Sequence, residues 1–346
     1  MRRCRTFALS LLILLVAFVV EVPAQGLSPQ APPRSQPSMN PSPGSPGAQA
    51  PGEPPAPGQK PGTGPQKAPP PPPPKPDPEA TKLVEQAISK MDLKQLGWIE
   101  TTLWQRMHFQ GLEFAASGRY IVGPDFHVRL DLTVDLSDLT GSIEVVGDGK
   151  MIWEASQIGK EPRVVHRRIK LADVLAVLNR REVPAAMRTE YAENQAFAGI
   201  APLLKALQLR VVFTKLEKNV SWKGHTDYRL TGVWNPQQVP PPAPPHSANQ
   251  PQRCELYLDE KTLWPDRIEW WGEAPPQTGE VLLLEMEFRS PKFGQKPPPR
   301  TFVFKATKED EERAEIDQTK AQIKLIKKRA GIKDPESDKA SDGTSR

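Results

Sequence analysis

Apolar and polar residues alternate along much of the chain between residues 98 and 304. In the most regular stretch, residues 126–136, every second residue is apolar and those between are His, Arg, Asp or Thr. Because side chains of a strand point to opposite faces in turn, this pattern predicts a strand with one buried and one solvated face. Similar patterns predict strands at 98–109, 113–122, 142–146, 150–156, 164–170, 210–216, 227–234, 253–259, 266–271, 280–289 and 301–304.

A helix is predicted to open this region at residue 79. Asp77 supplies an N-cap side chain, and Pro78 takes the first helical position, where a backbone N–H is not needed. Apolar residues then recur at helical spacing on one face of a helix that ends near Gly97. These residues are Leu83, Val84, Ala87, Ile88 and Met91.

Helical spacing returns after the sixth of the central strand patterns. Residues 171–181 and 184–207 carry Leu, Val, Ala and Met three and four positions apart, with Pro184 and Pro202 interrupting the run. We predict a mainly β protein with helices (α+β), in which short turns join a long antiparallel meander.

The domain boundaries follow from the same patterns. Nothing between residues 79 and 305 looks like a boundary, so residues 79–307 are expected to form one β-rich domain. The proline cluster at 236–251 falls between two strand patterns and is interpreted as a loop inserted into a hairpin. Residues 308–346 are expected to hold a charged helix, 308–329, and a polar tail.

The N-terminus has the pattern of a secretory signal. Arg2, Arg3 and Arg5 precede an apolar run at 7–20, and small residues follow up to Ala24. The run has about fourteen residues and a membrane span needs roughly twenty, which favours cleavage after residue 24 over a retained anchor. We therefore expect residues 1–24 to be a signal peptide, and the protein to be exported to the periplasm or cell envelope of a bacterium.

Residues 25–78 are mostly Pro, Gly, Ser, Ala and Gln. Such a segment buries too little apolar surface to offset its ordering entropy, and proline biases it toward extended polyproline II. We expect a disordered linker. A tether or passive spacer is favoured over a strip of ligands for proline-binding modules, since those partners are mostly intracellular.

The sequence offers little chemistry. Loss of the signal removes Cys4 and leaves Cys254 alone, so no internal disulfide can form. The five histidines are scattered without metal-ligand spacing, and no nucleophile elbow, P-loop or dinucleotide-binding motif is present. We predict no catalytic residue, no metal site and no cofactor, and hence no enzyme. The net charge of +5 includes arginines of the signal and supports no nucleic-acid partner.

A basic stretch precedes the helical block: Arg163, His166, Arg167, Arg168 and Lys170. It predicts either peripheral contact with an anionic membrane or, as the favoured interpretation, a solvated strand edge.

Several short motifs resemble a known family. Residues 117–120 (SGRY) lead into a strand, and residues 145–153 (VVGDGKMIW) place an Asp-Gly turn before a lysine and a tryptophan. Residues 258–268 (LDEKTLWPDRI) suggest a late hairpin, and residues 302–304 (FVF), followed by Asp317 and Thr319, a closing strand and tail. With the opening helix and the strand at 98–109, these motifs resemble the periplasmic lipoprotein carriers of the LolA/LolB type, of which the chain would be a divergent member.

The resemblance implies a curved, incomplete antiparallel β-barrel whose concave face is lidded by helices and encloses an apolar cavity for acyl chains. The implied partner is a lipid or lipoprotein acyl chain, with an envelope protein as a further partner that opens the lid. The alternative is a structural or protein-interaction module on the same fold, with its interior filled by side chains and the spacer serving assembly.

Eight tryptophans exceed what a core of this size usually needs, and a tryptophan suits a cavity rim because it joins a large apolar area to a polar edge. Packing between sheet and helices is the alternative for each of them. The residues expected to line the cavity each share a period-two face with other apolar residues: Met107, Trp153, Trp234, Trp270, Leu282, Leu284 and Met286.

Overall fold

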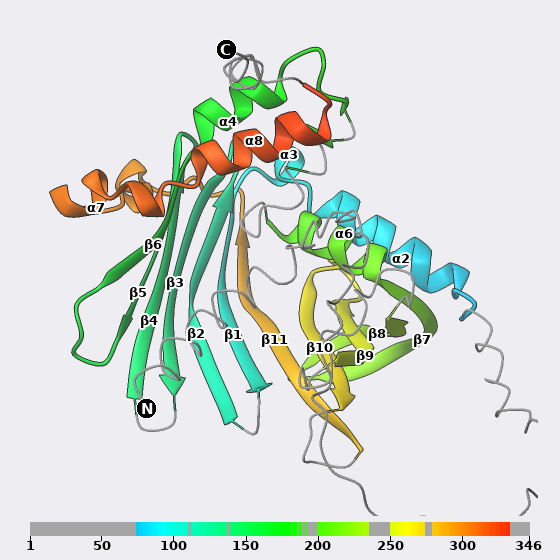
Figure 1. Ribbon diagram of the computed structural model, residues 1–346. Helices are drawn as coiled ribbons and strands as arrows, with labels where there is room; N and C mark the ends of the chain where they lie inside the picture. The colour runs from blue at the N-terminus through cyan, green and yellow to red at the C-terminus, as the bar shows by residue number, and fades with distance from the viewer. Residues whose placement is uncertain are drawn as a thin grey trace, which may run out of the picture. The chain divides into compact units, whose positions relative to one another are not determined.

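The computed structural model describes residues 74–332, apart from 110–111, 137–138, 186, 189–190, 192–198, 235–249 and 274–278. Eleven strands form one antiparallel sheet in the order β6-β5-β4-β3-β2-β1-β11-β10-β9-β8-β7 (Figure 1). The strands are β1 (Ile99–Phe109), β2 (Leu112–Gly123), β3 (His127–Leu136), β4 (Leu139–Asp148), β5 (Met151–Ile158), β6 (Val164–Lys170), β7 (Val211–Trp222), β8 (His225–Trp234), β9 (Gln250–Asp259), β10 (Pro265–Glu273) and β11 (Glu280–Phe293).

Two meanders meet in the middle of this sheet, where β1 pairs with β11. Strands β6 and β7 follow one another in the chain but form the two opposite edges of the sheet. The connection between them therefore has to cross the sheet, and it carries α4 (Leu171–Leu178) and α6 (Ile200–Arg210). We call the side on which these helices pack the helix-covered face, and the other side the opposite face.

The remaining helices are α2 (Pro78–Lys90), α3 (Leu93–Leu96), α7 (Lys308–Glu312), α8 (Thr319–Arg329) and the 3₁₀ turns η1 (Pro299–Phe302) and η2 (Ala314–Ile316). The predicted cap of α2 is present, since the Asp77 carboxylate accepts from the N–H groups of Glu79 at 2.8 Å and Ala80 at 3.1 Å. Helix α2 packs on α6 and β7, and α4 packs on α8 (Figure 1). No helix in the described ranges has the length and hydropathy needed to cross a membrane.

One hydrophobic core lies between these helices and the sheet. Every strand contributes to it, and so do α2, α4, α6 and α8. Its fully buried side chains include Ile99 and Leu130 from the first meander, Leu256 from the second, and Leu204 from α6. The sheet is not closed, because β6 and β7 do not pair. The predicted class, a mainly β fold with helices built on an incomplete antiparallel barrel, is confirmed.

Three sequence predictions of secondary structure are wrong. The opening helix does not continue to near Gly97, because α2 ends at Lys90 and Asp92 caps the separate helix α3. Residues 301–304 do not form a strand, because η1 occupies 299–302 and Phe302 packs against the Trp98 and His127 rings. Residues 308–329 are not one helix, because α7 ends after the capping box of Thr307 and Asp310, and α8 begins only at Thr319. The signal peptide at 1–24, residues 25–73 of the linker, nearly all of the 236–251 insertion and the tail beyond 332 lie outside the described residues.

Candidate functional site

Four of the seven expected lining residues come together on the helix-covered face. Met107 of β1 lies opposite Leu284 of β11, which lies opposite Trp270 of β10, so the three form one row across the middle of the sheet. Met286 lies one step along β11 on the same face. All four are 2–6 % exposed. The row continues to Cys254 of β9, whose thiol is fully buried and whose pKa is raised by that burial.

A fifth expected residue, Trp234 of β8, packs edge to face on Trp270 with ring centroids 5.4 Å apart. Both indole N–H groups are buried, and neither has an acceptor among the residues that the structure describes. A buried tryptophan normally finds a partner for its N–H, because an unpaired buried donor costs about 1–3 kcal/mol. Two adjacent unpaired donors on an otherwise apolar face therefore distinguish this end of the core from ordinary packing.

The last two expected residues lie elsewhere. Leu282 is half-buried two residues before Leu284. Trp153 of β5 lies on the opposite face, where its ring stacks on Phe304 at 4.9 Å in a small second core with Ala155, Val165 and Ile316.

Side chains of α4 and α6 pack closely on the sheet. Leu171, Val174 and Leu178 of α4, and Leu204 and Leu207 of α6, are at most 2 % exposed within the main core. Exposures this small leave no open room for an acyl chain next to these side chains. In this conformation a chain would have to replace helix side chains rather than enter an existing cavity.

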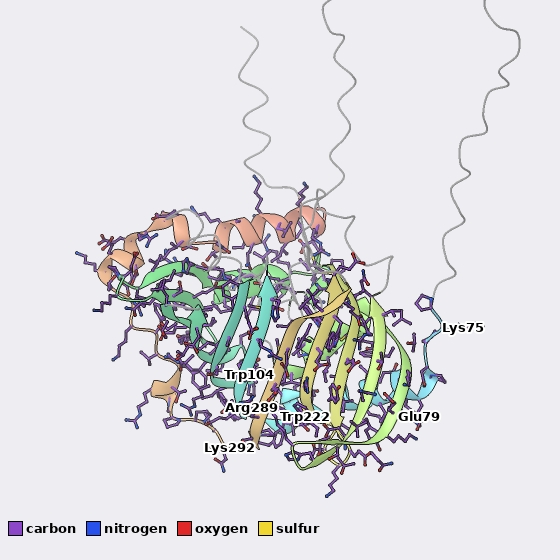
Figure 2. All side chains as sticks on the ribbon, turned by 90° about the horizontal axis from the view of Figure 1, so that it is seen from below. Lys75, Glu79, Trp104, Trp222, Arg289 and Lys292 are labelled. Carbon is purple, nitrogen blue, oxygen red and sulfur yellow. The ribbon has the colours of Figure 1, made fainter. Side chains whose placement is uncertain are left out.

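The opposite face of β1, β11 and β10 carries a network of charges and rings. Glu285 and Glu287 are buried there, and Glu285 pairs with Arg106 at 2.8 Å and with Arg267 at 3.1 Å. Arg289 lies 4.9 Å from the centre of the Trp104 ring (Figure 2). Because positive and negative groups pair with one another here, this face presents no large field of one sign.

The basic stretch before the helical block is also neutralised by partners. Arg163 pairs with Glu144 and Asp310, each at 3.3 Å, and Arg168 pairs with Asp317 at 2.9 Å. These contacts hold the C-terminal segment against β6, which is an edge strand of the sheet and keeps Val164 and Lys170 exposed.

A cleft of about 370 Å³ opens on the opposite face. The segment after β11 forms one of its walls, and aromatic rings from Trp98, His127, Trp153 and Phe302 line it.

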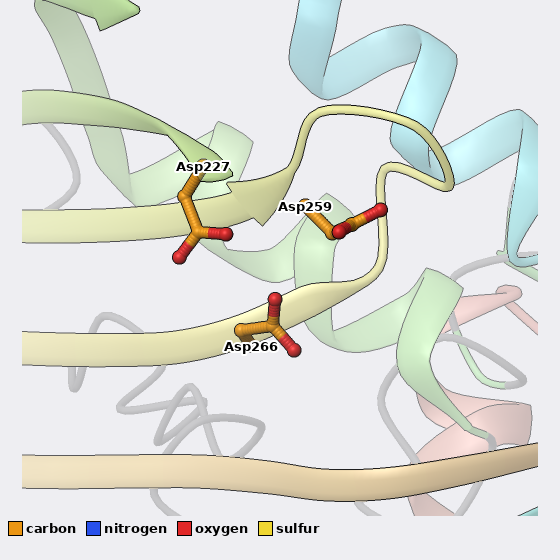
Figure 3. Close-up of side chains that lie close together, drawn as sticks. All are labelled: Asp227, Asp259 and Asp266. Atoms are coloured by element: carbon orange, nitrogen blue, oxygen red, sulfur yellow. The ribbon is translucent and has the colours of Figure 1, made fainter. Parts of the chain in front are cut away.

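Three aspartates that the sequence prediction missed meet where β8 and β10 begin and β9 ends. One carboxylate oxygen from each of Asp227, Asp259 and Asp266 lies within 4.8 Å of the others (Figure 3). Burial, together with the charge of Asp259, raises the pKa of Asp227 to about 6. Burial and the charge of Asp227 raise the pKa of Asp266 to about 7. Asp259 and Asp266 are near in sequence, but only the pairing of β8 with β9 brings Asp227 to them.

No protein-family model and no curated protein matches the chain. Among solved structures it is similar to LprF from Mycobacterium bovis, at 12 % identity over 65 % of this chain and 98 % of that one, with a TM-score of 0.33. It is also similar to an outer membrane lipoprotein-sorting protein domain from Vibrio parahaemolyticus, at 8 % identity over 65 % and 96 %, with a TM-score of 0.27.

A third similar structure is the MucA/MucB complex of Pseudomonas aeruginosa, at 13 % identity over 66 % of this chain and 61 % of that one, with a TM-score of 0.30. Identities and scores this low assign no ligand or partner to this chain.

Proposed function

We propose that this protein is an exported, non-catalytic binding protein of the bacterial cell envelope that holds an acyl chain between its helices and its sheet. The observation that carries the proposal is the pair of unpaired indole N–H groups of Trp234 and Trp270 beside the apolar row of Met107 and Leu284. Such a site suits a ligand that is mostly hydrocarbon and has a hydrogen-bond acceptor at one end.

The ester or amide carbonyl of a lipid or lipoprotein is an acceptor of this kind. It would take the hydrogen bonds of Trp234 and Trp270, and the attached chain would lie over Met107, Leu284 and Met286. Leu282, which is half-buried next to this row, would lie at the rim. Trp153 lies on the other face of the sheet and has no part in this site.

Whether an acyl chain can displace α6 depends on the free energy that each gains by burial against the sheet. Helix α6 buries Ile200, Leu204 and Leu207 fully and Ala201 nearly so, and the three large side chains are worth about 4.5–9 kcal/mol at 1.5–3 kcal/mol each. A sixteen-carbon chain gains about 12 kcal/mol gross at about 0.8 kcal/mol per methylene. The two terms are of similar size, so the chain and α6 can exchange places, and a partner that favours one arrangement would load or release the ligand.

The experiment is native mass spectrometry of the full chain, expressed in a bacterial periplasm and purified without detergent, followed by extraction with organic solvent. We expect one acyl species per chain. The stripped protein is then titrated with a palmitoyl lysophospholipid while its tryptophan fluorescence is recorded. Replacing both Trp234 and Trp270 with Phe should weaken binding at least tenfold, since each lost hydrogen bond is worth about 1 kcal/mol.

Trp104→Phe is the matched control, because Trp104 is a half-buried tryptophan on the opposite face and should leave the affinity unchanged. A protein that is empty as purified and that gives no fluorescence change with the lipid would refute the proposal. So would equal affinity of the double variant and the wild type.

One observation favours a second function. The side chains of α4 and α6 already fill the helix-covered face, as expected of an interaction module with no ligand. An empty protein that binds no lipid would favour this module.

A further inference from the structure

The three aspartates at the ends of β8, β9 and β10 are held together by strand pairing. Asp227 of β8 lies directly opposite Asp259, the last residue of β9. Like charges at directly opposed positions of an antiparallel pair are destabilising. Asp266 belongs to a β-bulge of β10, between the pairs of Pro265 and Arg267 with β9. Such bulges re-aim a side chain, and this one turns Asp266 toward the other two (Figure 3).

The hydrogen bonds of the cluster are unevenly distributed. Asp259 Oδ1 accepts from the N–H of Lys261 at 3.1 Å, and from the N–H and hydroxyl of Thr262, each at 2.7 Å. Asp227 is 0 % exposed, and within the described part of the chain neither of its carboxylate oxygens has a hydrogen-bond donor. Oδ2 of Asp266 is buried there without a donor as well. A fully buried carboxylate without donors is very costly, and proteins normally supply a partner.

Either a proton or a metal cation can neutralise the buried carboxylate oxygens of Asp227 and Asp266. A shared proton would join one oxygen of Asp227 to one of Asp266. When all three carboxyl groups are ionised, three negative charges converge and only a cation can balance them. The other titratable groups acting on them are His225, which is exposed, and Glu260, which adds a further negative charge.

Oxygen-only ligands select a hard cation. Calcium accepts carboxylates and water in irregular arrangements, whereas magnesium demands a near-ideal octahedron. Three carboxylates from three strands also leave space for water ligands on the side of Asp259 and Asp266, which are both partly exposed.

We propose that Asp227, Asp259 and Asp266 form a calcium site that ties together the ends of β8, β9 and β10. The ion replaces the shared proton and cancels the repulsion between the opposed carboxylates of Asp227 and Asp259. This site is separate from the acyl-chain site, and neither proposal depends on the other.

The test uses the full chain, stripped with EDTA and dialysed at pH 7.5. Equilibrium dialysis against calcium chloride should give one ion per chain, and the melting temperature should rise by about 5–11 °C at a hundredfold excess over Kd. Asp227→Asn should abolish both effects. Because this variant removes a buried charge, it should melt no lower than the calcium-free wild type, so loss of binding cannot be ascribed to unfolding.

The matched control is Asp148→Asn. Asp148 ends β4 and caps the following turn as Asp259 does, with Oδ1 accepting from the N–H groups of Lys150 at 2.8 Å and Met151 at 2.7 Å, but it belongs to no cluster of three acids among the described residues. This variant should keep the calcium response. Absence of bound calcium and of any shift in melting temperature at pH 7.5 overturns the proposal, and so does a wild-type response in Asp227→Asn.

Discussion

Two buried tryptophans offer a direct measurement of what an unpaired indole costs. Trp264 is 1 % exposed, and its Nε1–H donates to the carbonyl of Phe288 at 2.9 Å. Trp270 is 6 % exposed, and its N–H has no acceptor. Replacing either with Phe removes the same atoms from a similar depth in the core. The loss of packing is therefore similar in the two variants, and the hydrogen bond is the difference between them.

Trp264→Phe gives up a bond worth about 1 kcal/mol and leaves a buried carbonyl with one partner fewer. Trp270→Phe instead removes an unpaired donor and recovers about 1 kcal/mol of its burial cost. The free energy of unfolding should therefore fall by about 2 kcal/mol more in Trp264→Phe than in Trp270→Phe. In a domain of this size that difference corresponds to about 4–8 °C in melting temperature.

The assay is urea unfolding of the lipid-stripped protein, followed by circular dichroism so that the loss of a fluorophore does not matter. Equal losses in the two variants, or a larger loss in Trp270→Phe, would mean that the Trp270 N–H is paired in solution, and the reasoning about that site would be refuted. Repeating the measurement with bound lysophospholipid should narrow the gap, because the ligand carbonyl then becomes an acceptor for Trp270.

Three further predictions test the fold. Gly118→Ala should lower the free energy of unfolding by about 3 kcal/mol or more, because the new Cβ would lie 1.8 Å from the backbone oxygen of Asp131. Urea unfolding or loss of soluble protein would report this change, and an unchanged unfolding midpoint would contradict it. Asp77→Ala should cost about 1 kcal/mol through the lost cap of α2, and Asp77→Asn much less, as measured by thermal unfolding. Without calcium, the free energy of unfolding should fall as pH rises from about 4 through 7, because Asp227 and Asp266 hold protons in the folded state that they release on unfolding. Asp227→Asn should make this pH dependence flatter. A wild-type pH dependence in that variant would contradict the assignment.

Local patterns predicted the elements whose burial follows a single period. The alternation at 126–136 became β3, and Asp77 with Pro78 became the start of α2. The pattern at 301–304 failed because four residues cannot distinguish a strand from a short extended segment, and Pro298 and Pro299 favour a turn there. The charged pattern at 308–329 did not indicate that the helix is interrupted between α7 and α8, where Asp317 leaves helical geometry and pairs with Arg168 of β6.

The candidate sites depend on pairings that no local pattern contains. The row of Met107, Leu284 and Trp270 requires β1 beside β11, strands that lie at opposite ends of the domain sequence. Period-two reasoning could identify the apolar side of each strand, but it placed Trp153 with the others because it could not relate the faces of distant strands. The cluster of three aspartates was not predicted for the same reason, because Asp227 becomes a neighbour of Asp259 only through the pairing of β8 with β9.

The central position of the β1–β11 pair has a consequence for how the chain folds as it emerges from the ribosome. Strands β1 to β6 are complete long before β11 exists, and until then β1 presents a bare row of N–H and C=O groups along one side of a half-finished sheet. Such an edge readily pairs with other chains, and contacts between distant segments form slowly. A chain cut short before residue 280 should therefore aggregate rather than fold, and the second meander acts for the first as the strand donor that ends this exposure.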